Sequence, residues 1–233
     1  VPIKKIISKE RGSSLAQKID PQKVTLPEKL NPDSLLEESE NTTHYSIIDR
    51  DGNVVSNTYT LGYSFGSGVT IPGTGILLDN QMNNFAYQYG NPKVIDRSAS
   101  IGNKFEPGKR PMSTMTPIIV FDENNELKLI TGSPGGALIP AAVLRVVTGI
   151  IDFNLNLGEA TMLPRVHKDW PYENLRLEKG FSNDTLKILQ SYGHELEESK
   201  TMGSTQSILI SSKGKEGFAD LRRPNAGVAI QID

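Results

Sequence analysis

From residue 42 onward, the hydrophobic and polar positions follow the pattern of a folded domain. Residues 44–49 and 54–61 are rich in Thr, Tyr and β-branched residues, and each is typical of a strand. The turn signal Asp51-Gly52-Asn53 lies between them. The pattern therefore predicts a β-hairpin that opens the domain.

Further along the chain, the pattern predicts helices between two sets of strands. A helix expected over 137–153 is apolar on most of its circumference, which is typical of a buried central helix, and Pro140 fits in its first turn. A second helix, over 182–193, is capped by Ser182 or Asn183. It points Leu186, Ile188 and Leu189 inward. We also expect a short helix at 157–162 and strands at 75–78, 115–121, 126–131, 204–211 and 226–232. This order indicates an α+β fold rather than βαβ repeats.

Two segments lack this regularity. Residues 85–111 have little periodicity, and long irregular stretches inside a domain are commonly functional covers or disordered. Residues 1–41 predict a short helix broken at Gly12, then a proline-containing acidic stretch typical of a solvated linker or tail. Because the chain begins with Val1 and not Met, we expect a processed piece of a longer protein.

Composition excludes several classes of function. The 233 residues include 25 basic and 27 acidic side chains, a net charge of −2, so the chain lacks the strongly basic character of a nucleic-acid or membrane-surface binder. Cysteine is absent, which excludes disulfides, a cysteine nucleophile and thiolate metal sites. No run approaches the ~20 apolar residues of a membrane span.

The histidines and the common catalytic motifs give no metal or cofactor site. His44, His167 and His194 are not spaced as a metal-binding pair, so we expect structural or surface roles for them. The sequence contains neither a serine nucleophile elbow nor a phosphate-binding Walker loop. We therefore predict no metal and no cofactor.

Two local features could carry chemistry. In Gly132-Ser133-Pro134-Gly135-Gly136, glycines before a helix can direct backbone N–H groups at an anion, as in an oxyanion hole; a tight turn that leads into a helix explains the same residues. At Asn41-Thr42, a threonine hydroxyl becomes a nucleophile if the chain is cut before Thr42, because the freed α-amine can act as its base. Neither feature decides the function alone.

Several motifs in series resemble the small subunit of the γ-glutamyltransferase (γ-glutamyl transpeptidase) family. The resemblance extends from Thr42 to the C-terminus, in the family's order. Its motifs are Thr42-Thr43-His44-Tyr45-Ser46, Asp49-Arg50-Asp51-Gly52-Asn53, Gly75-Ile76-Leu77-Leu78, Asn80-Gln81-Met82, Lys109-Arg110-Pro111, Gly132-Ser133-Pro134-Gly135-Gly136, Pro164-Arg165, Glu178-Lys179-Gly180-Phe181 and Met202-Gly203-Ser204-Thr205-Gln206-Ser207. Residues 1–41 resemble the C-terminal end of the large subunit, joined as in an uncleaved precursor. This resemblance divides the chain into that tail and a catalytic domain over 42–233.

The resemblance implies a fold and a mechanism. The fold is the four-layer αββα sandwich of N-terminal nucleophile hydrolases. The precursor would cut itself between Asn41 and Thr42, and Thr42 would then form an acyl-enzyme with a γ-glutamyl compound such as glutathione. Water or an amino acid would resolve the acyl-enzyme, and the large subunit of the same precursor would be the partner.

Individual roles follow by resemblance. Thr60 matches a threonine that hydrogen-bonds the nucleophile, and Gly135 and Gly136 match the oxyanion-hole glycines. Ser113 and Thr114 match a Ser-Ser pair that holds the substrate α-carboxylate, although the second residue departs from it. Gln81 matches a residue that contacts the α-amino group. A large-subunit arginine that binds the α-carboxylate lies upstream of this chain, and bacterial members are exported to the periplasm or beyond.

Two departures leave an alternative substrate open. Gly62 stands where the family has an asparagine, and Asn84 stands where it has an aspartate that pairs with the substrate ammonium. The branch that depolymerises poly-γ-glutamate capsules resembles this chain at Asn84 and lacks a lid, whereas residues 89–100 here have the length of a transpeptidase lid. The alternatives are a depolymerase or amide acylase, and a catalytically silent, unprocessed precursor fragment.

Overall fold

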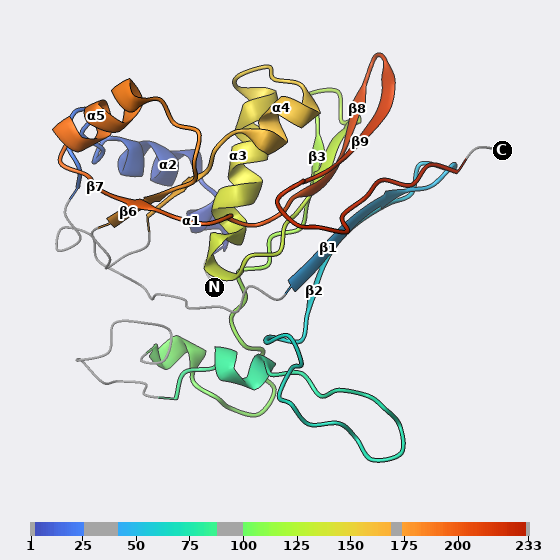
Figure 1. Ribbon diagram of the computed structural model, residues 1–233. Coiled ribbons are helices and arrows are strands. Elements are labelled where there is room, and N and C mark those ends of the chain that lie inside the picture. The colour runs from blue at the N-terminus through green and yellow to red at the C-terminus, as the bar shows by residue number, and fades with distance from the viewer. Residues whose placement is uncertain (1–2, 26–41, 88–99, 169–173, 232–233) are drawn as a thin grey trace.

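The computed structural model describes residues 3–25, 42–87, 100–168 and 174–231 (Figure 1). Two helices, α1 (Ile3–Ile6) and α2 (Lys9–Ala16), precede the domain. The helix break predicted at Gly12 is wrong, because Gly12 lies inside α2. The break falls at Ser8, whose side chain accepts a hydrogen bond from the Arg11 N–H and caps α2.

The predicted first hairpin is present. Strands β1 (Thr42–Ile48) and β2 (Val54–Thr60) pair antiparallel, in a register that sets Thr42 opposite Thr60. The Asp49 carboxylate closes the turn by accepting hydrogen bonds from the backbone N–H groups of Asp51 and Asn53.

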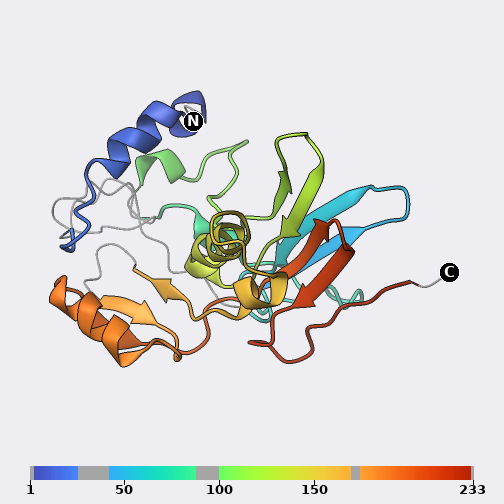
Figure 2. The same cartoon turned by 90° about the horizontal axis from the view of Figure 1, so that it is seen from above.

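A four-stranded antiparallel sheet forms the centre of the domain. Its order is β3 (Ile118–Phe121), β4 (Leu127–Thr131), β8 (Gln206–Ser211) and β9 (Gly214–Ala219). Helices α3 (Ile139–Ile151) and α4 (Leu157–Met162) lie together beside this sheet (Figures 1 and 2). Their apolar side chains meet those of the sheet in a core of Leu129, Val146, Ile150, Leu157, Ala160 and Leu209.

A second, smaller α/β unit lies at the other end of the molecule. Strands β5 (Val166–His167), β6 (Asn174–Leu177) and β7 (Glu195–Glu198) form a three-stranded sheet. Helix α5 (Asn183–Ser191) connects β6 to β7, which pair parallel, and Ser182 caps this helix as predicted. The sequence pattern did not predict this βαβ unit.

The β1–β2 hairpin packs on the four-stranded sheet through polar side chains. The Ser46 hydroxyl donates to the Gln206 carbonyl, and the Ser56 hydroxyl donates to the Thr131 carbonyl. Helices α3 and α4, the four-stranded sheet and this hairpin thus form three successive layers, α, β and β (Figure 2). The arrangement is an α+β sandwich, as predicted.

Four details of the prediction are wrong. Residues 75–78 form one isolated bridge, between Leu77 and Thr70, and residues 226–231 contain no strand. Helix α3 is not covered all round, because Leu144 is 61% exposed. Helix α5 does not turn Ile188 inward, since that side chain is half exposed.

The described residues also include short 3₁₀ turns, among them η2 (Gln81–Asn84), η4 (Ile101–Asn103) and η5 (Gly136–Leu138).

Candidate active site at the start of β1

The predicted nucleophile, Thr42, is the first residue of β1. It is buried, and its carbonyl accepts a hydrogen bond of 3.1 Å from Arg223 Nη1. The opposite residue, Thr60, accepts the Gly62 N–H on its hydroxyl oxygen at 2.9 Å. Hairpin register therefore brings together the two threonines that the sequence placed in one site. Asn41, the residue before the predicted cut, lies outside the described residues.

The predicted α-amino contacts lie next to this pair. The Gln81 side-chain amide reaches the Thr60 carbonyl at 3.4 Å. Asn84 Nδ2 donates to Gln81 Oε1 at 2.8 Å, because both residues belong to the 3₁₀ turn η2. Gln81 and Asn84 are thus one hydrogen-bonded unit, attached to the end of β2.

A residue that sequence reasoning missed, Asn103, connects this unit to the predicted α-carboxylate contacts. Its side chain is buried, donates to the Asn84 carbonyl at 2.6 Å and accepts the Met112 N–H at 3.2 Å. Met112 directly precedes Ser113 and Thr114. No local pattern marks Asn103, because its role depends on partners from two other loops.

Ser113 and Thr114 make different contacts. The Ser113 hydroxyl oxygen accepts the Met115 N–H at 3.1 Å, so its own hydrogen can still be donated. The Thr114 hydroxyl donates to the Gly136 carbonyl at 2.9 Å. Thr114 therefore connects the predicted substrate-binding segment to the glycine turn.

The glycine turn has a conformation that favours glycine. Gly135 and Gly136 have φ of +136° and +58°. The Leu138 N–H donates to the Gly135 carbonyl at 3.1 Å, which closes one 3₁₀ turn before α3 begins at Ile139. The helix thus starts two residues later than predicted.

His44 is a structural residue, in agreement with the expectation for the histidines. Its ring is buried between β1 and the Gly132 backbone, with Nδ1 2.9 Å from the Thr58 hydroxyl and Nε2 3.2 Å from that of Ser46. Burial lowers the pKa of His44 from 6.5 to about 4. The ring is therefore neutral at physiological pH, and it packs two residues away from Thr42.

Arg165, Glu178, Asp220 and Arg222 form a cluster of buried charged side chains. Arg165 pairs with Asp220 at 2.7 Å, and Arg222 pairs with Glu178 at 2.7 Å and with Asp220 at 3.2 Å. Burial opposes the charged form of Glu178, but the hydrogen bonds from Arg222 and from the Met202 and Arg165 N–H groups, together with the charge of Arg222, outweigh this and hold the pKa of Glu178 below its ordinary value. In the sequence, Arg165 and Glu178 stand out only as parts of motifs. Their partners, Asp220 and Arg222, carried no signal.

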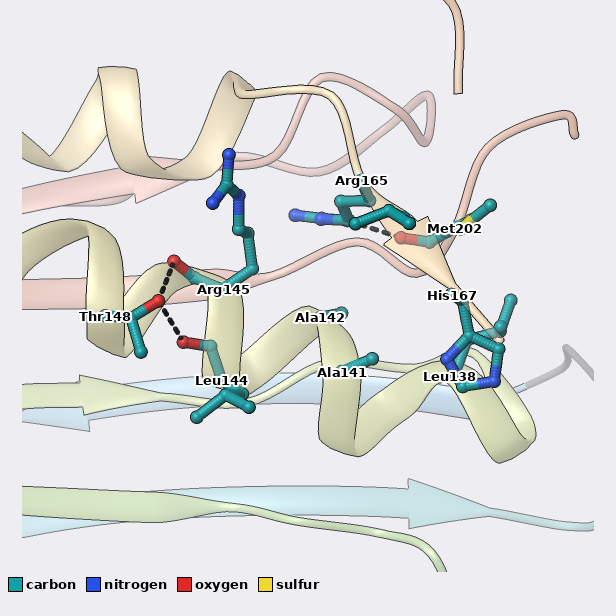
Figure 3. A pocket seen from close by; sticks show the side chains of 10 residues that line it. Leu138, Ala141, Ala142, Leu144, Arg145, Thr148, Arg165, His167 and Met202 are labelled. Carbon is teal, nitrogen blue, oxygen red and sulfur yellow. Dashed lines mark hydrogen bonds between the residues drawn. The ribbon is translucent and has the colours of Figure 1, made fainter. Parts of the chain in front are cut away.

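A pocket of about 220 Å³ lies beside the glycine turn, between α3 and the segment that carries Arg165 and His167 (Figure 3). Leu138, which follows the turn, and Met202 form part of its mostly apolar lining. Within the described ranges, no group of three or more His, Asp or Glu side chains is placed to hold a metal ion. None of the helices described has the length and apolar character needed to cross a membrane.

Known proteins share this arrangement. The chain is 43% identical over 216 residues to a glutathione hydrolase proenzyme of Escherichia coli, an alignment that covers 92% of this chain and 37% of that protein. The solved structure of a mutant γ-glutamyltranspeptidase of Helicobacter pylori is 40% identical, with a TM-score of 0.70 and coverage of 78% of this chain and 100% of that chain. The transpeptidase enzyme CapD of Bacillus anthracis is 25% identical, with a TM-score of 0.61 and coverage of 81% and 99%.

The layered α+β sandwich and these likenesses define an N-terminal nucleophile hydrolase fold. The family model for gamma-glutamyltranspeptidase matches residues 1–230, and the chain belongs to that family. It spans about two fifths of the length of two curated relatives that it matches.

Proposed function

We propose that this chain carries the nucleophile of an enzyme that hydrolyses or transfers γ-glutamyl groups, glutathione among its substrates. The placement of Thr42 carries the proposal. It is buried at the first position of β1, opposite Thr60, in a hairpin that packs on the sheet leading to the glycine turn. The likeness to a glutathione hydrolase proenzyme supports both the reaction and the precursor state.

Maturation begins at the bond between Asn41 and Thr42. The Thr42 hydroxyl attacks the Asn41 carbonyl carbon, and the C–N bond breaks as the acyl group moves to oxygen. The broken C–N bond leaves the Thr42 α-amine free. Water then hydrolyses the resulting ester, which restores the Thr42 hydroxyl and leaves a carboxylate on Asn41. This amine, with an ordinary pKa of about 8, is the base that the mature nucleophile needs.

Turnover uses the same hydroxyl. The Thr42 oxygen attacks the γ-carbonyl of the donor while the α-amine takes the hydroxyl proton. The N–H groups of Gly135 and Gly136 stabilise the oxyanion, and the leaving amine departs with the proton. Water then gives free glutamate, or an amino acid gives a new γ-glutamyl amide.

The α-amino and α-carboxylate groups of the substrate bind at the Gln81–Asn84 unit and at Ser113. The Ser113 hydroxyl is available to donate its hydrogen to the α-carboxylate. The Thr114 hydroxyl instead donates its hydrogen to the Gly136 carbonyl. Gln81 and Asn84 offer neutral amides to the α-amino group. Such a neutral subsite favours an acylated α-nitrogen over a free ammonium.

That neutrality is the observation that favours a second candidate, a poly-γ-glutamate depolymerase. Internal α-nitrogens of such a polymer are acylated and need no carboxylate partner. The likeness to a glutathione hydrolase proenzyme, at 43% identity, makes the depolymerase the second choice. Parallel kinetics on glutathione and on poly-γ-glutamate separate the two. Residues 89–99 of the proposed lid lie outside the described residues.

The remaining part of the precursor docks on the outer face of the β1–β2 hairpin. This face is apolar, whereas the face toward the four-stranded sheet is polar. Tyr45, Ile47, Val55 and Tyr59 are all between 43% and 60% exposed. A two-stranded sheet is marginal by itself, so it gains stability when a partner covers this face.

Docking is tested in the full-length, cleaved protein by size exclusion on dilution. Ile47→Asp should make the two fragments separate at a higher protein concentration. Leu221→Asp, at a residue that is 72% exposed outside the hairpin, is the matched control and should leave their co-elution unchanged. Co-elution of the Ile47→Asp fragments at every concentration would contradict the proposed interface.

Intact mass of the full-length precursor tests the function first. Cleavage before Thr42 releases a fragment of roughly 21 kDa, the share of the 25.5 kDa chain that residues 42–233 represent, with threonine as its first residue. A precursor that stays uncut and inactive would favour the silent scaffold instead. A cut precursor that releases no glutamate from glutathione or poly-γ-glutamate would refute the proposed substrate class.

A further inference from the structure

The glycine turn lies in close backbone contact with the segment Met202-Gly203-Ser204. A Cβ on Gly135 would stand 3.0 Å from Gly203 Cα. A Cβ on Gly203, whose φ is +71°, would stand 2.7 Å from the Ser133 hydroxyl oxygen and 3.1 Å from the Pro134 carbonyl oxygen. Side chains at either glycine would push the two segments apart.

One hydroxyl connects these segments. Ser133 has no exposed surface, and its Oγ accepts the Ser204 N–H at 2.9 Å. The same hydroxyl donates to the Pro134 carbonyl oxygen at 2.6 Å. Ser133 is therefore held by a backbone group across the contact, and it in turn holds the peptide unit between Pro134 and Gly135.

That peptide unit contains the N–H of Gly135. A peptide bond is planar and trans, so its C=O and N–H point in opposite directions and turn together. The hydrogen bond from Ser133 to the Pro134 oxygen thus sets where the Gly135 N–H points. The N–H of Gly136 belongs to the next peptide unit, whose carbonyl is fixed by the Leu138 N–H at 3.1 Å. The first donor of the pair depends on a side chain, whereas the second depends on backbone alone.

The anchor for Ser133 is itself fixed by buried charge. Arg165 Nη1 donates to the Met202 carbonyl at 2.5 Å, and the Met202 N–H donates to Glu178 Oε1 at 2.6 Å. The Thr205 N–H donates to Asp220 Oδ2 at 3.0 Å. The residues on both sides of Ser204, Met202 and Thr205, are therefore bound to the ion-paired cluster, which holds the Ser204 N–H in place.

We infer that Ser133 is a positioning residue of the reaction, which aims the Gly135 N–H at the developing oxyanion through the Pro134 carbonyl. The inference rests on the proposed function. Alanine at this position leaves the Ser204 N–H and the Pro134 carbonyl without their shared partner, and the peptide unit can then rotate away from the oxyanion. Loss of one oxyanion donor typically slows kcat about 100- to 1,000-fold, so partial misalignment should cost about 10- to 100-fold.

The test compares Ser133→Ala with Ser207→Ala in the full-length, matured protein. Ser207 is a matched control because it is also buried and its hydroxyl makes a 2.7 Å hydrogen bond to the Thr131 side chain, not to the peptide unit that carries the Gly135 N–H. We expect Ser133→Ala to lower kcat for a chromogenic γ-glutamyl donor by about 10- to 100-fold with KM nearly unchanged. A boronate analogue of the tetrahedral intermediate should lose affinity in parallel. Ser207→Ala should lower Tm to a similar degree but leave kcat within about twofold.

The outcomes separate the two proposals. Wild-type protein that releases no glutamate refutes the proposed function. Active wild type together with an unchanged kcat in Ser133→Ala refutes the positioning role alone, and so does an equal loss of kcat in Ser207→Ala. Should Ser133→Ala fail to fold, Ser133→Cys keeps a group of similar size with a weaker donor. It should show the same split between kcat and KM.

Discussion

Acidification should destabilise the protein through His44, well above the pH at which carboxylates titrate. The Ser46 hydroxyl donates its hydrogen to the Gln206 carbonyl, so it accepts from His44 Nε2, and Nδ1 accepts from Thr58. Nδ1 is thus the nitrogen that must take the second proton. It lies in a buried site where desolvation lowers the pKa to about 4.

The sign and size follow from proton linkage. The unfolded chain binds a proton at His44 below pH 6.5, whereas the folded protein binds it only below about pH 4. Between these values the unfolded state holds more protons, so stability falls as pH falls. At about 1.36 kcal/mol per pKa unit, the whole shift corresponds to ~3 kcal/mol, fully present above pH 6.5 and lost at pH 4. About 2 kcal/mol of this is lost by pH 5.

Urea unfolding at pH 7.5 and pH 5 measures the pH-dependent contribution of His44 to stability when His44→Gln is compared with its parent. Both chains carry Thr42→Ala, so that each is a single uncut precursor. Glutamine does not titrate, and its amide can still serve Thr58 and Ser46. Glu178 and Asp220 have pKa values below the ordinary carboxyl range, and both chains share them, so they cancel in the difference. The stability advantage of His44 should shrink by about 2 kcal/mol at pH 5. An advantage that does not change with pH would refute the reasoning.

Three further substitutions test the candidate active site and the buried charge cluster. Thr42→Ala should abolish both cleavage and turnover, whereas Thr42→Ser, which keeps a hydroxyl, should retain part of each; mass spectrometry and glutamate release measure them, and activity in Thr42→Ala would remove this residue from the mechanism. Asn84→Asp should lower KM for donors with a free α-amine about tenfold or more, since a charge-assisted hydrogen bond contributes about 1.5–3 kcal/mol; an unchanged KM would assign the ammonium to other groups. Glu178→Gln should destabilise the fold by about 3–5 kcal/mol in chemical unfolding, because it removes one of the two buried carboxylates that pair with Arg222; a loss below about 1 kcal/mol would show that the pair is dispensable.

Local sequence signals predicted the elements that depend only on residues close together in the chain. The hairpin of β1 and β2 follows from one turn signal and β-branched strands, and its register alone sets Thr42 opposite Thr60. The Ser182 cap was equally visible, because a cap acts on residues three positions away. Such features need no tertiary context.

Elements that depend on a distant partner were missed. Strand β9 contains two glycines, a lysine and a glutamate, a composition that disfavours strands, and it forms because every one of its residues pairs with β8. Residues 226–231 have the better strand pattern but pair with no strand among the described residues. Asn103 is a comparable case within the site, since its side chain connects two loops that are far apart in sequence.

The glycine turn shows why the two interpretations left open by the sequence could not be separated locally. A tight turn before a helix needs glycine only for positive φ, and Gly135 and Gly136 satisfy that need in either interpretation. The second requirement comes from the close approach of Gly203, because a Cβ on Gly135 would stand 3.0 Å from Gly203 Cα and a Cβ on Gly203 would stand 2.7 Å from the Ser133 hydroxyl oxygen. An ordinary turn gains nothing from such an approach, nor from a buried hydroxyl that fixes the peptide plane before Gly135. An anion site does, because a hydrogen-bond donor stabilises developing charge only when its direction is set before the charge forms.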